Sequence, residues 1–309
     1  MNNLKKLGLT ALGTALVTSS AVAGELSVTG VAGITYTGNS TTDNGASKLA
    51  QKTTIGFSGS TDLDNGFTVS YYNNVSGGAM TAGNQHFHVD MGDMGSLRFA
   101  GAGASGNGAL EAWDDVMPAA NEETWHLATG PLTAQTRSDS LIYTNSTMVD
   151  GVTVILNYKP GETTHDSTTG AGIKFTGVEG LDVGFAMEDN NTTNGAVVEN
   201  TVAYVKYAMD AFTVGFQANE ADSQTANSDK DFEAWGVSYA ISEDISISYG
   251  ASTIEFENSS LSDQEASAIG VSWTNGSMSV AASRHDTANV GGTATDDRDI
   301  TEVNITFAF

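Results

Sequence analysis

The sequence of 309 residues contains no cysteine, which excludes disulfide-stapled modules and cysteine-based metal or redox sites. Basic residues are also scarce, with 12 lysines and arginines against 37 acids, and the net charge of -25 makes a nucleic-acid partner unexpected. Beyond the N-terminus no run exceeds about four apolar residues, so the sequence offers no membrane-spanning helix of about 18 residues. The three prolines fall in predicted loops or at a loop end.

The N-terminus has the features of an export signal. Lys5 and Lys6 precede an apolar run from Leu7 to Val17, and Ala21-Val22-Ala23 supplies small residues for cleavage after Ala23. An uncleaved anchor is the alternative, but about eleven residues are too few to cross a bilayer. We therefore expect residues 1–23 to be a signal peptide and 24–309 the mature protein, with a net charge of -27 after two lysines are lost.

The mature chain is dominated by alternation of apolar and polar residues with a period of two, the pattern of β-strands with two different faces. In Glu25 to Thr37, for example, Leu26, Val28, Ile34 and Tyr36 share one face. About sixteen such segments can be marked out. They start near Glu25, Leu49, Phe67, Asn84, Gly95, Asp139, Val152, Gly170, Leu181, Glu199, Ala211, Asp231, Ile245, Glu265, Ser277 and Arg298.

The connections between these segments alternate between short and long. The short ones, such as Asp150-Gly151 and Asn275-Gly276, have the turn residues of tight hairpins. The long ones, such as Gly38 to Lys48 and Gly77 to Gly83, are polar. This asymmetry, an even strand number and apolar outward faces predict an all-β, transmembrane antiparallel β-barrel with short periplasmic turns and long extracellular loops. A closed barrel leaves no unpaired strand edge in lipid.

The C-terminal segment Asp299 to Phe309, DITEVNITFAF, alternates apolar residues outward and ends on phenylalanine. It resembles the closing strand of the general diffusion porins of Gram-negative outer membranes, and GELSVTGVAGITYTG resembles their opening strand. The resemblance implies that Ile305, Phe307 and Phe309 are the signal read by the barrel assembly machinery. It also implies a homotrimer in the outer membrane, and a third long loop folded into the lumen.

The longest connection, residues 104–138, follows the fifth predicted strand, where porins insert their constriction loop. Its apolar residues, including Trp113 and Trp125, are unusual for a loop wholly in water. A connection of this length inside a compact domain is expected to have a function. We expect some of its acids to line the narrowest part of the pore, with a solvated surface loop as the alternative. These acids are Glu111, Asp114, Asp115, Glu122 and Glu123.

Strand parity also predicts which basic residues face the lumen. All four candidates have the polar parity of their strands, and three of them, Arg98, Lys174 and Lys206, lie between apolar residues of the opposite parity. A charge on the lipid side would cost several kcal/mol. The candidates are Lys52, Arg98, Lys174 and Lys206. Lys52, Arg98 and Lys174 are expected near mid-strand, level with the constriction, and Lys206 nearer the periplasmic end. Opposed charges across a narrow pore orient polar solutes and reject apolar ones.

Other motifs carry less weight. Gly101 to Gly106 matches G-x-G-x-x-G, but no βαβ unit follows it, so a dinucleotide site is not expected. His86, His88 and Asp90 alternate on one strand face, and we interpret them as lumen lining rather than a metal site. Asp296 to Asp299 could bind calcium, although the spacing matches no calcium loop. We expect no enzyme activity, no catalytic residue, no resident metal and no cofactor.

The sequence therefore predicts an outer-membrane porin for passive diffusion of small hydrophilic solutes and ions, with mild cation selectivity. A barrel of about sixteen strands is wide enough for an aqueous channel. Two alternatives stay open. One is a substrate-specific channel of the same fold, and the other is a non-channel secreted or surface β-protein such as an adhesin or layer protein.

Overall fold

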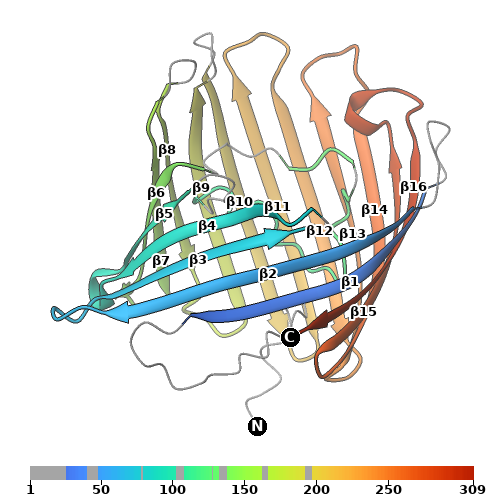
Figure 1. Cartoon of the computed structure of the whole chain (residues 1–309). Coiled ribbons are helices and arrows are strands. Elements are labelled where there is room, and N and C mark those ends of the chain that lie inside the picture. Colours follow the sequence, from blue (N-terminus) through green and yellow to red (C-terminus); the bar gives the residue numbers. More distant parts are fainter. Residues whose placement is uncertain are drawn as a thin grey trace.

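The computed structural model describes residues 26–39, 48–77, 79–101, 108–126, 128–131, 138–161, 166–191 and 197–309. Sixteen antiparallel strands form one closed barrel, each bonded to its neighbours in sequence (Figure 1). The strands are β1 (Ser27–Asn39), β2 (Lys48–Asp62), β3 (Thr68–Ser76), β4 (Thr81–Asp90), β5 (Ser96–Ala100), β6 (Ser140–Val149), β7 (Val152–Lys159), β8 (Thr168–Phe175), β9 (Leu181–Asn191), β10 (Val197–Met209), β11 (Phe212–Ser223), β12 (Lys230–Ala240), β13 (Ile245–Phe256), β14 (Gln264–Asn275), β15 (Met278–Ala288) and β16 (Arg298–Ala308).

The sixteen predicted strand starts all lie within three residues of the observed ones. The prediction of a long loop over Gly77 to Gly83 is wrong, because β4 already begins at Thr81 and the connection is a tight turn. Residues 1–23, the predicted signal peptide, lie outside the described residues. No helix among the described segments is long and apolar enough to cross a membrane.

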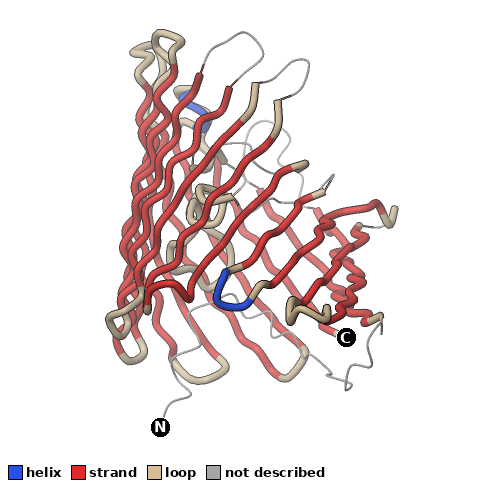
Figure 2. The backbone as a smooth tube through the Cα atoms, turned by 90° about the vertical axis from the view of Figure 1, so that its left-hand side faces the viewer, coloured by secondary structure: helices blue, strands red, loops and turns tan. Residues whose placement is uncertain are grey.

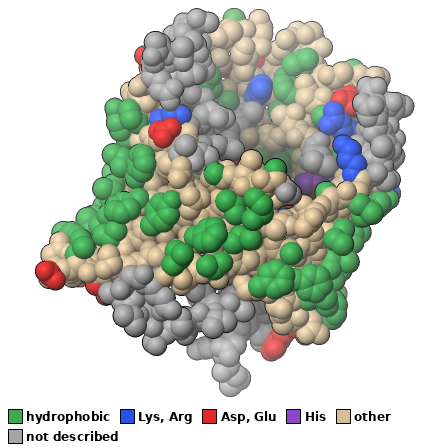
Figure 3. Space-filling view, viewed as in Figure 1, with side chains coloured by type: hydrophobic (Ala, Val, Ile, Leu, Met, Phe, Trp, Pro, Cys, Tyr) green, Lys and Arg blue, Asp and Glu red, His purple; other side chains and the backbone are tan. Residues whose placement is uncertain are grey.

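The two faces of each strand differ as the alternation requires. In β16, Ile305 and Phe307 are exposed on the outside, whereas Glu302, Asn304 and Thr306 point inward and are buried. Apolar side chains gather on the outer surface over β1, β2 and β3 (Figure 3). Such an outward apolar band is what a lipid bilayer requires of a spanning barrel.

Pairing of β1 with β16 closes the barrel, in a register from Val31 opposite Ala308 to Asn39 opposite Ile300. The backbone of Phe309 continues this ladder through two hydrogen bonds with Gly30, of 2.9 and 3.1 Å. Because both ends of the described barrel take part, no strand edge is left unpaired between the first and the last strand.

The short turns that follow the even-numbered strands, from β2–β3 to β14–β15, lie together at one rim, where the chain also ends at Phe309 (Figure 1, Figure 2). Their tightness depends on residues that accept positive φ. Gly276 has φ 57° between β14 and β15, and Asp210 has φ 51° between β10 and β11. The connection from β5 to β6, which starts at the opposite rim, is the longest in the chain.

Candidate pore constriction

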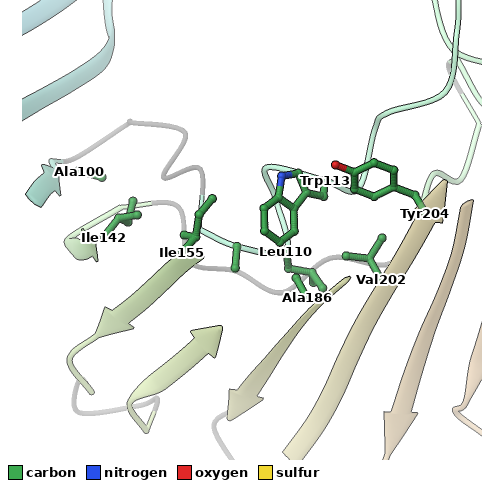
Figure 4. Packing of buried hydrophobic residues seen from close by; sticks show 9 residues of the cluster. Ala100, Leu110, Trp113, Ile142, Ile155, Ala186, Val202 and Tyr204 are labelled. Carbon is green, nitrogen blue, oxygen red and sulfur yellow. The ribbon is translucent and has the colours of Figure 1, made fainter. Parts of the chain in front are cut away.

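The connection between β5 and β6 packs against the inner wall of the barrel. Leu110 and Trp113 of this loop are buried among Ile155, Val202 and Tyr204, which point inward from β7 and β10 (Figure 4). Since the outward faces of these strands hold the exposed apolar side chains, this internal layer between loop and wall is where apolar groups are removed from water.

A second apolar cluster holds the later part of the loop. Trp125 packs edge-on against Phe232 of β12, with ring centroids 5.1 Å apart and an interplanar angle of 86°. Met117 and Ile254 complete the contact. Edge-to-face aromatic pairs of this kind are favourable beyond the area they bury. The apolar residues that are unusual for a surface loop thus attach it to the wall at two places.

Hydrogen bonds from the wall meet the loop in strand order. They join Asn157 of β7 to Ala109, Gln217 of β11 to Val116, Ser248 of β13 to Ala120, and Asn304 of β16 to Asn121. The described part of the loop therefore runs along the inner wall from β7 to β16. The wall from β1 to β5 borders the open part of the lumen.

Two buried amide side chains of the wall form hydrogen bonds with N–H and C=O groups of the loop backbone. Gln217 accepts a hydrogen bond from the Val116 amide at 3.3 Å and donates to the Asp114 carbonyl. Gln264 accepts from the Thr129 amide at 3.3 Å and donates to the Thr129 carbonyl at 2.8 Å. A backbone segment without regular structure needs such partners when it is buried, and an amide supplies both a donor and an acceptor.

The wall also lacks side chains where the loop comes closest. A Cβ atom at Gly215 of β11 would lie 2.8 Å from Pro118 Cδ, and one at Gly236 of β12 would lie 3.0 Å from the Pro118 carbonyl oxygen. Any larger residue at these positions would push the loop away from the wall.

The five predicted loop acids all lie in this inward-folded segment. Glu111, Asp114, Glu122 and Glu123 are half-buried, and Asp115 is exposed to the lumen. Leu110, Trp113, Met117 and Trp125 face the wall, whereas all five acids of the loop keep some exposed surface.

Several of these carboxylates lie close enough to affect one another. Although part of Asp115 is exposed, its surroundings inside the barrel desolvate the carboxyl, and this desolvation together with a hydrogen bond with Glu123 raises the pKa of Asp115 to about 8. Repulsion by Asp114 and Glu122 acts in the same direction. At neutral pH the Asp115 carboxyl therefore keeps its proton and can donate it to Glu123.

Arg98 lies in the middle of β5, at the wall that borders the open lumen. Its Nη2 is 3.3 Å from His86 Nδ1 of β4, and its guanidinium is attracted to Glu111 of the loop. The structure thus brings one predicted wall base together with one predicted loop acid. His86 and His88 have the inward parity on β4, because the Phe87 between them is exposed on the outside.

Lys52 of β2 pairs with Gly33 of β1, whose neighbour on the same face, Thr35, donates to Asn304 inside the barrel. Lys52 is therefore an exposed lumen residue on the wall of β1 to β5.

The expected mid-strand position of Lys174 is wrong. Lys174 is the last but one residue of β8 and lies two residues beyond Gly172, where Trp113 packs. Lys206 also lies towards the short-turn rim, with its Nζ 3.8 Å from Asp182 Oδ2. Both have the inward parity, because Ile173 and Val205 are exposed on the outside, but they lie on the turn side of the loop. β8 ends at Phe175, one residue after Lys174, which is why Lys174 lies near the rim.

Comparison with known proteins agrees with this geometry. Residues 8–309 match the family described as Gram-negative porin. The chain belongs to the Gram-negative porin family. It is an outer-membrane channel for passive diffusion, as this family and its fold are.

Three solved porins show the shared fold. Salmonella typhi OmpF, in a complex with daunomycin, has a TM-score of 0.75 at 15% identity, covering 93% of this chain and 98% of that one. The anion-selective porin of Comamonas acidovorans has a TM-score of 0.71 at 11% identity, covering 93% and 100%. The trimer form of Vibrio cholerae OmpT has a TM-score of 0.71 at 13% identity, covering 93% and 100%. No curated protein matches the sequence.

The closed barrel of this porin excludes the architectures of the non-channel alternative, since neither a sandwich nor a solenoid has this strand order. The fold leaves a substrate-specific channel possible, because such a channel would differ from a general porin only at the constriction.

The sequence reasoning did not select two residues at the far end of the loop. His126 Nε2 of this porin lies 2.9 Å from Glu302 Oε2 of β16, and His126 Nδ1 lies 3.5 Å from Glu122 Oε2. Glu302 has the inward parity of β16, so its position in the lumen could have been predicted. Its contact with His126 could not, because the two residues are 176 positions apart.

The acidic segment from Asp296 to Asp299 lies at the long-loop rim. Two of its three carboxylates are ion-paired, Asp296 with Arg298 at 3.0 Å and Asp299 with Arg284 at 3.6 Å, and Asp297 accepts a hydrogen bond from the Asn289 amide. These arginines compete with a calcium ion for the same oxygens. The possible calcium site therefore stays a prediction, and the geometry does not favour it.

Proposed function

We propose that this channel prefers cations, and that the acids of its inward-folded loop determine the preference. The supporting observation is the position of five acids on a loop whose apolar side chains pack against the inner wall. These acids are Glu111, Asp114, Asp115, Glu122 and Glu123. Rings or rows of carboxylates at a narrow passage raise the local concentration of cations. Acids on the outer loops contribute less, because salt screens exposed charges within about 10 Å.

The fold by itself leaves the sign of selectivity open, since one similar structure is an anion-selective porin. Arg98 and Lys52 on the opposite wall limit the cation preference, so we propose a mild one. Transport is passive and involves no cofactor and no catalytic step. The solutes are small and hydrophilic, because a passage lined by opposed charges favours groups that can replace hydration water.

The test is the reversal potential of the mature protein in a planar bilayer under a potassium chloride gradient. We expect a cation preference that falls when the five loop acids are changed together to glutamine and asparagine. A matched variant removes the same number of acids, all exposed, from the outer faces of β11 to β14. These are Glu220, Asp231, Glu233, Glu255 and Glu265.

The matched variant should keep the wild-type reversal potential. If both variants shift it equally, the total charge of the protein and not the loop determines selectivity. If the folded protein inserts and carries no current, the channel is plugged, and the open-pore function is wrong.

We also propose that the barrel assembles as a homotrimer and that the barrel assembly machinery recognises its last strand. One similar structure is a trimer form, and Phe309 of this chain is 74% exposed at the end of an outward apolar row with Ile305 and Phe307. Deleting Phe309 should reduce the amount of folded barrel in the outer membrane while refolding in detergent continues. Equal reduction in both settings would indicate a structural defect and not a lost signal.

A further inference from the structure

Three residues at the far end of the constriction loop bring their side chains together. Oxygen atoms of Glu122 and Glu123 and a ring nitrogen of His126 all lie within 4.8 Å of one another. A tight turn, closed by a hydrogen bond of 3.1 Å from the His126 amide to the Glu123 carbonyl, returns the imidazole to the two carboxylates. The three groups are half-buried, and Glu122 and His126 lie next to β16, where they meet Asn304 and Glu302.

The other ring nitrogen of His126 has a partner of its own. His126 Nε2 lies 2.9 Å from Glu302 Oε2, and Asn304 Nδ2 donates to Glu302 Oε1 at 2.6 Å. When Nε2 donates to this carboxylate, the lone pair of Nδ1 points to the side where Glu122 Oε2 lies, at 3.5 Å. A carboxylate that orients the second nitrogen of a histidine is a recurrent feature of metal sites, where it fixes the tautomer.

A second imidazole packs against the ring of His126 on the wall side. His285 of β15 has no exposed surface, and its ring centroid is 5.2 Å from that of His126. The His285 ring is bonded to Ser283 Oγ, 2.8 Å from its Nε2, and to the backbone of Thr124. This fixed neighbour limits the orientations that the His126 ring can adopt.

The excess of carboxylates around His126 favours the binding of a cation. Among the described residues, the ion pairs of Glu122 and of Glu302 are both with His126, which is a weak base. Three carboxylates and one imidazole thus carry an excess of negative charge, and a divalent cation would neutralise it.

We propose that Glu122, Glu123 and His126 bind one divalent transition-metal ion of the zinc class at the pore constriction, with Glu302 as the positioning residue of His126. One imidazole and two carboxylates form a mixed nitrogen and oxygen set that suits zinc, whereas calcium and magnesium prefer oxygen alone. Three protein ligands leave the fourth position to water or a solute.

Binding of the ion requires only the folded barrel. Its effect on transport rests on the proposed function of the loop acids. An ion at this site adds positive charge where the cations pass, so it should reduce the cation preference and the cation current.

The first experiment measures zinc binding to the detergent-folded mature protein by calorimetry, with any affinity tag removed. We expect one equivalent of zinc, not displaced by calcium or magnesium in large excess. Glu123→Gln and His126→Gln should abolish the binding, and Glu302→Gln should weaken it about 10- to 100-fold. His88→Gln removes a lumen histidine from β4 and is the matched control, which should bind as the wild type does. The heat-dependent gel shift of a folded barrel checks each variant.

The outcomes separate this inference from the proposed function. Binding that survives in Glu123→Gln and His126→Gln, or that calcium displaces, overturns the metal site. A protein that conducts without metal but binds no zinc also overturns it and leaves the channel intact. A protein that binds zinc through these residues but never conducts keeps the site and overturns the channel.

Discussion

The inner wall from β7 to β16 and the inner wall from β1 to β5 are built from the same alternating strands, but they face different surroundings. The first is covered by the loop and has buried apolar residues such as Ile155, Val202 and Phe232 on its inward face. The second borders water, with Lys52 and Arg98 on that face. Strand alternation therefore means two things inside one barrel: an inward face can be a hydrophobic core or a pore lining, depending on what packs on it.

The same comparison explains how charge is separated across the lumen. The loop directs its apolar side chains to one wall and keeps its acids partly exposed, with Glu122 next to Asn304 of β16, while the uncovered wall supplies Lys52 and Arg98. The electrostatic attraction between Arg98 and Glu111 links the two sides. Three changes would break or sharpen this contrast.

The largest effect is expected from Trp113→Ala, which leaves a cavity in the apolar cluster between the loop and the covered wall. Trp113 is 4% exposed and touches Tyr204, so its loss should reduce the free energy of unfolding by about 3–5 kcal/mol. We expect the loop to detach and single-channel conductance to rise. Denaturant unfolding in detergent and bilayer recordings measure the two effects, with Trp113→Phe as the control. Unchanged conductance after a loss of stability would mean that the loop does not narrow the pore.

A smaller effect concerns the pore side of the loop. The pKa of Asp115 is raised to about 8, so this carboxyl is neutral below that pH and charged above it. Cation preference should therefore rise between pH 7 and pH 9 in the presence of a chelator. The reversal potential at each pH measures it, and Asp115→Asn should remove this rise. A rise that persists in Asp115→Asn would assign it to another group, such as His126, whose pKa is raised by its hydrogen bond with Glu302 and by Glu122 despite burial.

The smallest effect is expected on the uncovered wall. Arg98→Gln removes one positive charge opposite the loop and releases Glu111, so the reversal potential should move slightly further towards cations. Lys206→Gln is the comparison, because Lys206 is paired with Asp182 on the turn side of the loop and should change selectivity less. A larger shift from Lys206→Gln than from Arg98→Gln would place the narrowest passage nearer the short-turn rim.

Much of the barrel could be predicted because its rules are local. A period of two and tight-turn residues such as Asp150-Gly151 repeat along the chain, and each strand pairs with its sequence neighbour, so no distant pairing had to be guessed except β1 with β16. Parity gave the inward direction of Lys52, Arg98, Lys174 and Lys206 for the same reason. Strand ends follow weaker signals, which is why Lys174 was placed too far from the rim.

The sequence by itself determined the alternating strands, their outward apolar faces and the five acids of one long connection, because these are properties of neighbouring residues. Only the tertiary structure decided where that loop lies and what its far end meets. His126, His285 and Glu302 are brought together by barrel closure and by a loop that runs along the inner wall. Contacts between residues so far apart depend on the shape of the whole barrel, and no local pattern encodes them.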